Sequence, residues 1–520
     1  VYTHGYGAVA SLSAERTAEG QPQFVLKDIP PQPASPELGV PTGGVYFGES
    51  SAVDYSVVNT EQRELDYLTE DGVQYKSYEG RGGVEMSGLL RRVAFAWRFR
   101  NINIAISSLI HDDSRILFYR DVDDRVRTAA PFLRFDDDPY AVIDGGRMKW
   151  IVDGYTVSPM YPYAERLDFS TRTGVSDDGG LSDENNYVRN SVKAVVDAYD
   201  GTLDFYLWDE SDPIIRSWAG IFPDLFKEKE QMPPSLRAHV RYPEDLFRIQ
   251  TWMYTRYHVQ NAQDFFARTD AWVIPNDPVQ RTGVPAGTPP EIEPYYVLMQ
   301  LPGEQRLEYV LITPMNPRAR RNMVAWVAAR SDPDVFGQLI DFRFPKTREV
   351  DGVTTVHTRI NQNEAISRER TLLGARGLGS SVTFGNLLVI PIQDSLLYVQ
   401  PMFVKAEVNG IPELKNVILA TDERVVMGQT LQDALKLVVA GGGTVVPGTE
   451  TPGEEGVAPT VAQLLEEARR HLDAADAALK AGDWATYGRE EQAARDAIRR
   501  ATEVAPTPPP EPEPEPAPGV

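Results

Sequence analysis

Paired apolar runs, each pair joined by a short turn sequence, recur along the chain and constrain its fold more than any other feature. Residues 192–199 and 202–208 flank Asp200-Gly201, which is typical of a two-residue β-hairpin turn. Three more pairs follow the same pattern: 140–144 with 148–156, 295–301 with 307–313, and 382–391 with 395–405. The last pair holds long apolar runs, NLLVIPI and SLLYVQPMFV, which indicate strands buried on both faces.

Helices interrupt these hairpins. Residues 85–100 place five apolar side chains at helical spacing: Leu89, Leu90, Val93, Ala94 and Trp97. Residues 243–258 begin with Pro243-Glu244-Asp245, which puts acidic groups near the positive end of the helix dipole. Residues 430–439 predict a further helix. Because strands and helices are intermixed without regular βαβ units, we predict a mixed α/β fold of the α+β class.

Changes in composition predict the domain boundaries. Pro/Gly-rich or acidic polar stretches at 29–44, 170–186 and 278–290 predict loops. We predict a first part of an α+β body at 1–275, a strand-rich second part at 291–440, and a flexible linker at 441–459. An apolar stripe from Val461 to Leu479, a stop at Gly482 and a second apolar segment predict a tethered helical hairpin at 460–505. The Pro/Glu-rich residues 506–520 predict a disordered tail.

Charge and cysteine content exclude several functions. The formal net charge of −23 argues against a nucleic-acid partner and against broad docking onto anionic lipid. The chain has no cysteine, which excludes thiol catalysis, thiolate metal sites and disulfides. Such a chain suits an oxidising outside compartment, although cysteine-poor codon usage explains it equally well. The excess of arginine over lysine points to GC-rich coding and an actinobacterial source.

No apolar run reaches the roughly 18 residues that a membrane-spanning helix needs. The chain starts without a methionine, in structured-looking sequence (VYTHGYG). We therefore expect a fragment whose natural start lies upstream.

Several long motifs carry a resemblance to a known family. They are VYTHGYG, RGGVEMSGLLRRVAFAWRF, DSRILFYRDVDDRV, NYVRNSVKAVVDAYDG, MPPSLRAHVRYPEDLF, EPYYVLMQLPGE, RRNMVAWVAARSD, GNLLVIPIQDSLLYVQP and AGDWATYG. Together they resemble uncharacterised protein family 0182 over most of the chain. The resemblance implies a prokaryotic protein of the cell membrane, with a bundle of about seven membrane helices followed by a large exported domain. This chain is then the extracytoplasmic portion, with that bundle as its partner. The family carries over no activity and no site residue.

Clustered aspartates form the first candidate site. Asp136, Asp137 and Asp138 follow other acidic residues closely, and carboxylates of this kind hold Ca²⁺ through six to eight oxygen ligands. They also suit paired acid/base catalysis. A solvated acidic surface interleaved with arginines is the alternative. No other cofactor is predicted.

Ligand binding has two further candidates. Arg318, Arg320 and Arg321 form a dense basic group that suits phosphate or carboxylate, either on a ligand or on the protein itself. His4 lies among glycines that let a backbone approach a ligand closely, although a structural turn explains it as well. A third set combines aromatic side chains that suit a sugar or peptide groove or a protein core: Trp252, Tyr254, Tyr257, Phe265, Phe266 and Trp272.

Three functions follow as hypotheses. The preferred one is an exported binding or assembly domain without enzymatic activity, acting on an envelope protein or polymer or on further copies of itself in a homo-oligomer. The second is a cell-envelope hydrolase that uses paired carboxylates. The third is a transport or channel accessory domain whose acidic surface gathers cations.

Overall fold

The structure is a computed structural model of the 520-residue chain. It describes residues 2–440 except 18–19, 42, 50–52, 70–71, 167–180, 182–183, 280–289, 375–379, 393–394 and 407–411. The chain divides into two compact units, Val1–Pro447 and Gly448–Val520. The predicted linker, helical hairpin and tail at 441–520 lie outside the described residues, as do most of the predicted loops at 170–186 and 278–290.

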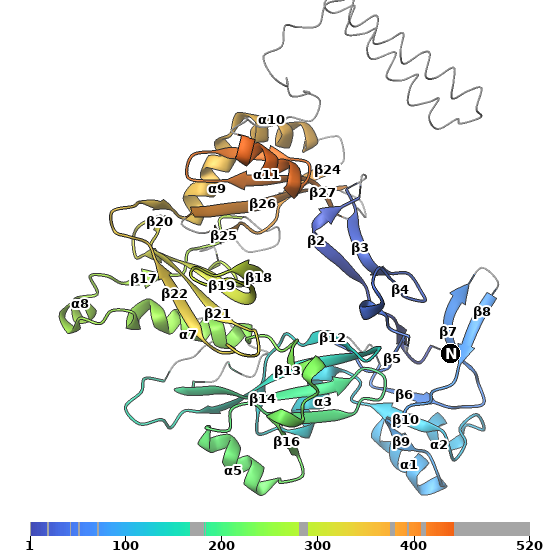
Figure 1. The fold of residues 1–520 in the computed structure, drawn as a ribbon. Helices are drawn as coiled ribbons and strands as arrows, with labels where there is room; N and C mark the ends of the chain where they lie inside the picture. The colour runs from blue at the N-terminus through green and yellow to red at the C-terminus, as the bar shows by residue number, and fades with distance from the viewer. Residues whose placement is uncertain are drawn as a thin grey trace, which may run out of the picture. The chain divides into compact units, whose positions relative to one another are not determined.

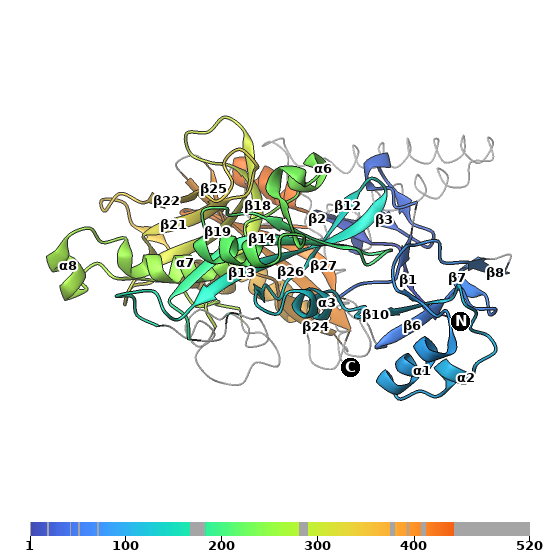
Figure 2. The same cartoon turned by 90° about the horizontal axis from the view of Figure 1, so that it is seen from below.

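A six-stranded, mostly antiparallel sheet forms one part of the first unit (Figures 1 and 2). Its order is β11-β13-β14-β15-β16, and β12 also pairs with β13. The strands are β11 Arg134–Phe135, β12 Tyr140–Asp144, β13 Arg147–Ser158, β14 Tyr187–Asp197, β15 Leu203–Leu207 and β16 Phe226–Glu228. Helices α3 (Val122–Ala129) and α5 (Pro213–Ile221) pack on it and bury Val122, Val126 and Ile215 in one apolar cluster.

Two further antiparallel sheets follow in sequence. The first has the order β17-β19-β21-β22 with β18 beside β19, and the second has the order β24-β26-β27-β28 with β25 beside β26. The first comprises β17 Trp272–Val273, β18 Tyr295–Gln300, β19 Leu307–Pro317, β21 Ala325–Arg330 and β22 Leu339–Arg343. The second comprises β24 Ser380–Phe384, β25 Leu388–Ile392, β26 Ser395–Ala406, β27 Glu413–Ala420 and β28 Val425–Gly428. Helices α9 (Val353–Gln362), α10 (Glu364–Leu373) and α11 (Leu431–Ala440) accompany the second sheet.

Helix α7 (Glu244–Tyr257) joins these parts through the largest apolar cluster. Its buried side chains Leu246, Phe247 and Ile249 share that cluster with Tyr155 of β13 and Leu311 of β19. The helix thus packs against two sheets at once, which fixes the direction of its polar face. Short helices α6 (Pro234–Arg237) and α8 (Ala262–Ala267) precede and follow it.

Small sheets make up the N-terminal region, and β10 lies between β6 and β9 in one of them. The strands are β1 Gly5–Tyr6, β2 Ala10–Arg16, β3 Pro22–Lys27, β4 Gln32–Pro33, β5 Gly44–Val45, β6 Tyr55–Val58, β7 Glu64–Thr69, β8 Gly72–Lys76, β9 Val84–Glu85 and β10 Arg115–Phe118. Helices α1 (Leu89–Arg98) and α2 (Asn103–Ile106) pack on β10 through Met86, Ala96, Ile104 and Ile116. A further pair, β20 (Asn322–Met323) and β23 (Val350–Asp351), lies later in the chain.

The predicted α+β class is confirmed, as are three of the four hairpins; in the fourth, the antiparallel pairing of 388–392 with 395–399 is confirmed. The single strand predicted at 382–391 is wrong, because it divides into β24 and β25, which both pair with β26. At the break, Gly385 donates its backbone N–H to Pro401, and a Cβ there would lie 2.6 Å from the Pro401 ring. The helix predicted at 85–100 begins only at Leu89, since Val84–Glu85 pair with β10 and Gly88 has a φ of 80°.

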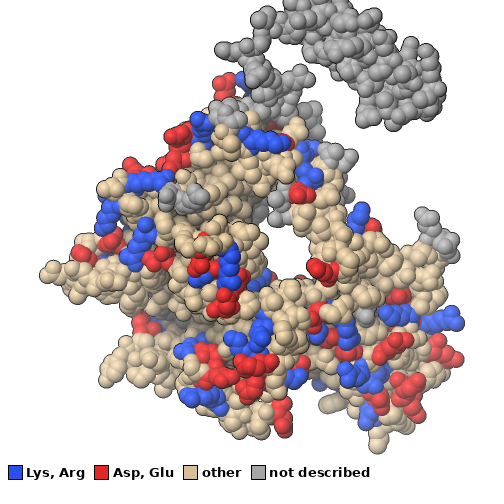
Figure 3. All heavy atoms as spheres, viewed as in Figure 1, with Lys and Arg blue, Asp and Glu red and all other residues tan. Residues whose placement is uncertain are grey.

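The net charge of −23 is not gathered into one acidic patch on the face that Figure 3 shows, where acidic and basic side chains are interspersed. Within the described residues, no helix is both long enough and apolar enough to cross a bilayer.

Candidate ligand-binding site

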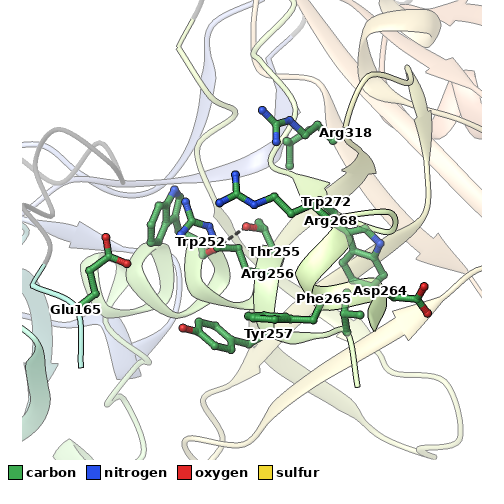
Figure 4. A pocket seen from close by; sticks show the side chains of 13 residues that line it. Glu165, Trp252, Thr255, Arg256, Tyr257, Asp264, Phe265, Arg268, Trp272 and Arg318 are labelled. Atoms are coloured by element: carbon green, nitrogen blue, oxygen red, sulfur yellow. Dashed lines mark hydrogen bonds between the residues drawn. The ribbon is translucent and has the colours of Figure 1, made fainter. Parts of the chain in front are cut away.

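A pocket of about 470 Å³ lies where α7, α8, β17 and the turn after β19 meet (Figure 4). Its lining combines the guanidinium groups of Arg256, Arg268 and Arg318 with the indoles of Trp252 and Trp272. Tyr257, Phe265, Asp264 and Glu165 complete the part of the lining used below.

The local sequence explains why α7 and α8 meet at an angle here. Asn261 caps α8, because its side chain accepts the backbone N–H groups of Gln263 and Asp264. Arg268 ends the helix with a left-handed backbone, φ 54° and ψ 35°, and donates its N–H to the carbonyl of Asp264. This C-cap turns the chain toward β17, so that Arg268 lies between the helix pair and the strand.

Strand pairing brings Arg318 to the same place. Trp272 and Val273 of β17 pair with Pro317 and Asn316 at the end of β19. The N–H of Arg318 then donates to the carbonyl of Ala271 at 2.8 Å. Residues separated by more than forty positions in sequence therefore share one wall of the pocket.

The three guanidinium groups are exposed. Among the described residues, none of Arg256, Arg268 and Arg318 forms an ion pair. In Figure 4 the side chains of Arg268 and Arg318 extend toward the side of the pocket where Trp252 lies. Arg256 lies over the Trp252 ring, which holds a cation and an aromatic face side by side. The arrangement suits a carboxylate or a phosphate, to which guanidinium groups donate in fork geometry.

The rest of the lining is aromatic and acidic. The rings of Tyr257 and Phe265 lie 5.6 Å apart. Asp264 accepts a hydrogen bond from the hydroxyl of Thr269 at 3.2 Å, and Glu165 is exposed. Two carboxylates beside aromatic rings can accept hydroxyl groups of a ligand while the rings contact its apolar face.

Trp272 forms the rigid wall of the pocket. Its indole stacks on His258 with the ring centroids 3.7 Å apart. The two ring nitrogens of His258 face the backbone carbonyls of Tyr254 and Asp270 at 2.9 and 2.8 Å. Both residues are buried and held on two sides, so this wall is preformed.

The structure separates the three arginines predicted from sequence. Arg318 lines the pocket, whereas Arg320 and Arg321 lie on the exposed turn beyond it and are not part of the lining. Ala319, between Arg318 and Arg320, has a left-handed backbone with a φ of 75°, which directs these two side chains differently.

His4 lies elsewhere, among buried tyrosines. Its ring stacks on Tyr46 at 4.6 Å, and its two nitrogens contact the Asp66 carboxylate at 3.1 Å and the Thr3 hydroxyl at 3.0 Å. These contacts tie the start of the chain to β7. The prediction that His4 binds a ligand stays a prediction.

Asp136, Asp137 and Asp138 have three different sets of partners. Asp136 is buried and accepts a 2.5 Å hydrogen bond from the Tyr155 hydroxyl. Asp137 pairs with Arg127 at 3.1 Å, and Asp138 pairs with Arg241. Within the described part of the chain, no three acidic or histidine side chains are grouped as metal ligands. The calcium site stays a prediction.

A buried charged cluster surrounds Asp136. Lys193 of β14 pairs with Asp153 of β13, and both are buried. Burial raises the pKa of Asp136 well above its usual range, and burial raises the pKa of Asp245 to about 7. Burial also lowers the pKa of Lys193, against the attraction of Asp153. None of these four side chains lines the pocket. Because their pKa values are shifted by burial, they make the stability of the fold depend on pH.

Four of the six aromatic side chains singled out in the sequence line the pocket, and their binding of a sugar or peptide stays a prediction. Trp252, Tyr257, Phe265 and Trp272 line it. Phe266 does not line it, and Tyr254 contacts Asp341 and Arg343 outside it. Sequence reasoning missed Arg256 and Arg268; Arg256 follows Trp252 by four positions in a predicted helix, which is the spacing of neighbours on one face.

Comparisons with known proteins agree with one another. The family model described as Uncharacterised protein family (UPF0182) matches residues 1–373. A UPF0182 protein of Desulforamulus reducens is 41% identical over 510 residues, covering 96% of this chain and 52% of the relative. UPF0182 proteins of Geobacter sulfurreducens and Bradyrhizobium diazoefficiens are 43% and 42% identical, covering 94% and 96% of this chain and 52% and 51% of their own lengths. The chain thus spans about half the length of the curated relatives it matches. No solved structure matches it.

Proposed function

Because the chain belongs to the uncharacterised protein family UPF0182, whose description names no activity, we propose a function from its pocket: it is a binding domain for an acidic saccharide. The observation that carries the proposal is the convergence of Arg256, Arg268 and Arg318, without ion-pair partners in the described residues, on one pocket beside Trp252. A sugar that bears a carboxylate or a phosphate matches this lining.

Each part of the lining has a role in that complex. The guanidinium groups donate hydrogen bonds to the acidic group of the sugar. The carboxylates of Asp264 and Glu165 accept its hydroxyl groups. The rings of Trp252 and Tyr257 cover its apolar face and exclude water from the ion pairs. The pocket of about 470 Å³ has the volume of a small-ligand site.

We further propose that this domain is the extracytoplasmic part of a longer membrane protein and binds such sugars on polymers of the cell envelope. The relatives are about twice as long as this chain, which leaves room for a membrane bundle of their own. The absence of cysteine suits an oxidising compartment. Assembly into a homo-oligomer and the hydrolase and transport alternatives stay predictions.

Calorimetric titration of the chain with glucuronate, glucose 6-phosphate and glucose tests the binding proposal. We expect the two acidic sugars to bind at least about tenfold more tightly than glucose, because charged hydrogen bonds contribute about 1.5–3 kcal/mol each. The double substitution Arg256→Gln and Arg318→Gln should remove that preference.

The matched control is Arg320→Gln with Arg321→Gln, which removes the same charge from the neighbouring turn outside the pocket. It should leave the affinity for glucuronate unchanged. Equal losses in both double variants, or no binding of either acidic sugar, would overturn the proposal.

A further inference from the structure

An apolar surface remains uncovered on helices α1 and α2. Leu90 and Trp97 of α1 are 89% and 84% exposed, and Ile102 and Ile106 around α2 are 66% and 69% exposed. Leu89, Val93 and Leu109 extend the same surface. Single exposed apolar residues are ordinary, but seven within one short segment are not.

The helix geometry explains why these side chains face outward together. At about 100° per residue, Leu89, Leu90, Val93 and Trp97 fall within roughly 100° of the circumference of α1. Phe95 and Phe99 lie on the opposite side and, with Ala96 at the boundary between the two sides, pack with Ile104 and Ile116. Helix α1 therefore has two apolar sides, of which the protein core covers one.

Basic residues flank this surface, and acidic residues are missing from it. Residues 86–111 contain four arginines, Arg91, Arg92, Arg98 and Arg100, and no aspartate or glutamate. Of these four arginines, only Arg92 forms an ion pair within the described residues, with the exposed Asp112 at 3.5 Å. The local positive charge of this segment contrasts with the net charge of −23 of the whole chain.

A hollow between the two helices combines both features. It has a volume of about 870 Å³, and its lining includes Val93, Trp97 and Ile102 together with Arg98 and Arg100. The Arg98 guanidinium donates to the Tyr119 hydroxyl at 2.7 Å, which holds it beside the apolar surface.

We propose that the α1–α2 surface docks onto an anionic phospholipid bilayer. The apolar side chains enter the boundary between headgroups and acyl chains, and the arginines contact lipid phosphates, as in interfacial amphipathic helices. Trp97 has the side chain that is enriched at this depth. A second copy of the chain fits the surface poorly, because a twofold contact would bring the two sets of arginines together.

The overall acidity of the chain does not prevent this contact. Charges that lie farther from the bilayer than the Debye length, about 8 Å at physiological ionic strength, are largely screened. Within that distance Asp112 offsets the charge of Arg92, and the bilayer experiences Arg91, Arg98 and Arg100 more than the distant carboxylates. The net charge of the whole chain argues against broad docking onto anionic lipid, but it does not argue against docking through this one surface. The inference goes beyond the proposed saccharide site and does not use any residue of that pocket.

Sedimentation of the full chain with lipid vesicles tests the proposal. We expect binding to vesicles of phosphatidylcholine mixed with phosphatidylglycerol, weaker binding to phosphatidylcholine alone, and loss of binding at high salt. Leu90→Gln with Trp97→Gln should lower the partition coefficient about tenfold or more. Arg91→Gln with Arg100→Gln should have an effect of similar size that depends on phosphatidylglycerol.

Two controls distinguish binding through this surface from nonspecific hydrophobic binding. Leu298→Gln with Phe266→Gln removes exposed apolar side chains elsewhere, 60% and 90% exposed, and should leave vesicle binding unchanged. Trp97→Phe should keep the binding and remove the blue shift of tryptophan fluorescence that vesicles induce. Absence of binding to phosphatidylglycerol vesicles, or equal losses in the control variant, would contradict the proposal.

Discussion

The guanidinium carbon of Arg256 lies 4.8 Å from the centre of the Trp252 indole, one turn earlier on the same helix. The pair holds a cation over an aromatic face at the mouth of a pocket that Arg268 and Arg318 also line. Helix α7 can present this pair because its other side is fixed in the main apolar cluster. The binding surface is thus attached to the largest apolar cluster of the first unit.

Replacing Arg268 should weaken ligand binding without lowering the stability of the fold. Its backbone is left-handed, which costs an L-residue about 1–2 kcal/mol and glycine much less. Arg268→Gly should leave the free energy of unfolding unchanged or raise it by up to about 1 kcal/mol, while weakening glucuronate binding. Urea denaturation and calorimetry on the same preparation measure the two effects. A variant that loses stability and keeps its affinity would contradict the role given to Arg268.

Asp245 should make the chain less stable as the pH rises. Its pKa is raised to about 7 by burial, whereas an aspartate in the unfolded chain titrates near 3.9. Between these values the folded chain holds a proton that the unfolded chain has released, so the stabilisation present at low pH is lost as the pH rises through 7.

Asp245→Asn should remove that slope and raise the free energy of unfolding at pH 8 by about 2 kcal/mol. Denaturant titrations from pH 5 to pH 8 on the variant and the parent chain measure it. Asp224→Asn, at an exposed aspartate, is the control and should keep the slope of the parent. An identical slope in Asp245→Asn would show that the carboxyl is ionised in the fold.

Arg330 neutralises a buried carboxylate. Its Nε donates to Glu308 at 2.6 Å and its Nη2 pairs with Glu304 at 2.9 Å, and the Glu308 side chain is fully buried. Arg330→Gln should lower the free energy of unfolding by up to about 3–5 kcal/mol, because it removes the nearer cation from the buried Glu308 and leaves only Arg306 at 3.4 Å. Arg368→Gln breaks an exposed pair with Glu364 and should cost less than about 0.5 kcal/mol. Similar losses of unfolding free energy in Arg330→Gln and Arg368→Gln would contradict this prediction.

Tyr295 links the two C-terminal sheets. Its hydroxyl donates to the carbonyl of Val389 at 2.6 Å and accepts the N–H of the same residue at 2.7 Å. Tyr295→Phe leaves both backbone groups without that partner and should lower the free energy of unfolding by about 1–3 kcal/mol. Tyr309→Phe, on the adjacent strand, should change it little. Thermal unfolding of the two variants checks the prediction, and a neutral Tyr295→Phe would be the contrary result.

The hairpins and long helices could be predicted because their information is local. Asp200-Gly201 fixes its turn, and Pro243-Glu244-Asp245 marks the start of α7. The break at Gly385 could not be predicted, since it depends on Pro401 of a neighbouring strand.

The pocket was only partly predictable for the same reason. The aromatic residues of α7 and α8 are close in sequence, but Arg318 joins them through the pairing of β17 with β19. The outward direction of Leu90 and Trp97 was also hidden, because helical spacing shows that a face is apolar and not which face the core covers.

A crystal structure of the chain soaked with glucuronate tests the central claim most directly. We predict the sugar carboxylate within hydrogen-bonding distance of Arg256, Arg268 or Arg318, with the sugar ring between those groups and the aromatic lining. Glucuronate bound at another place, or an unoccupied pocket at saturating concentration, would contradict it.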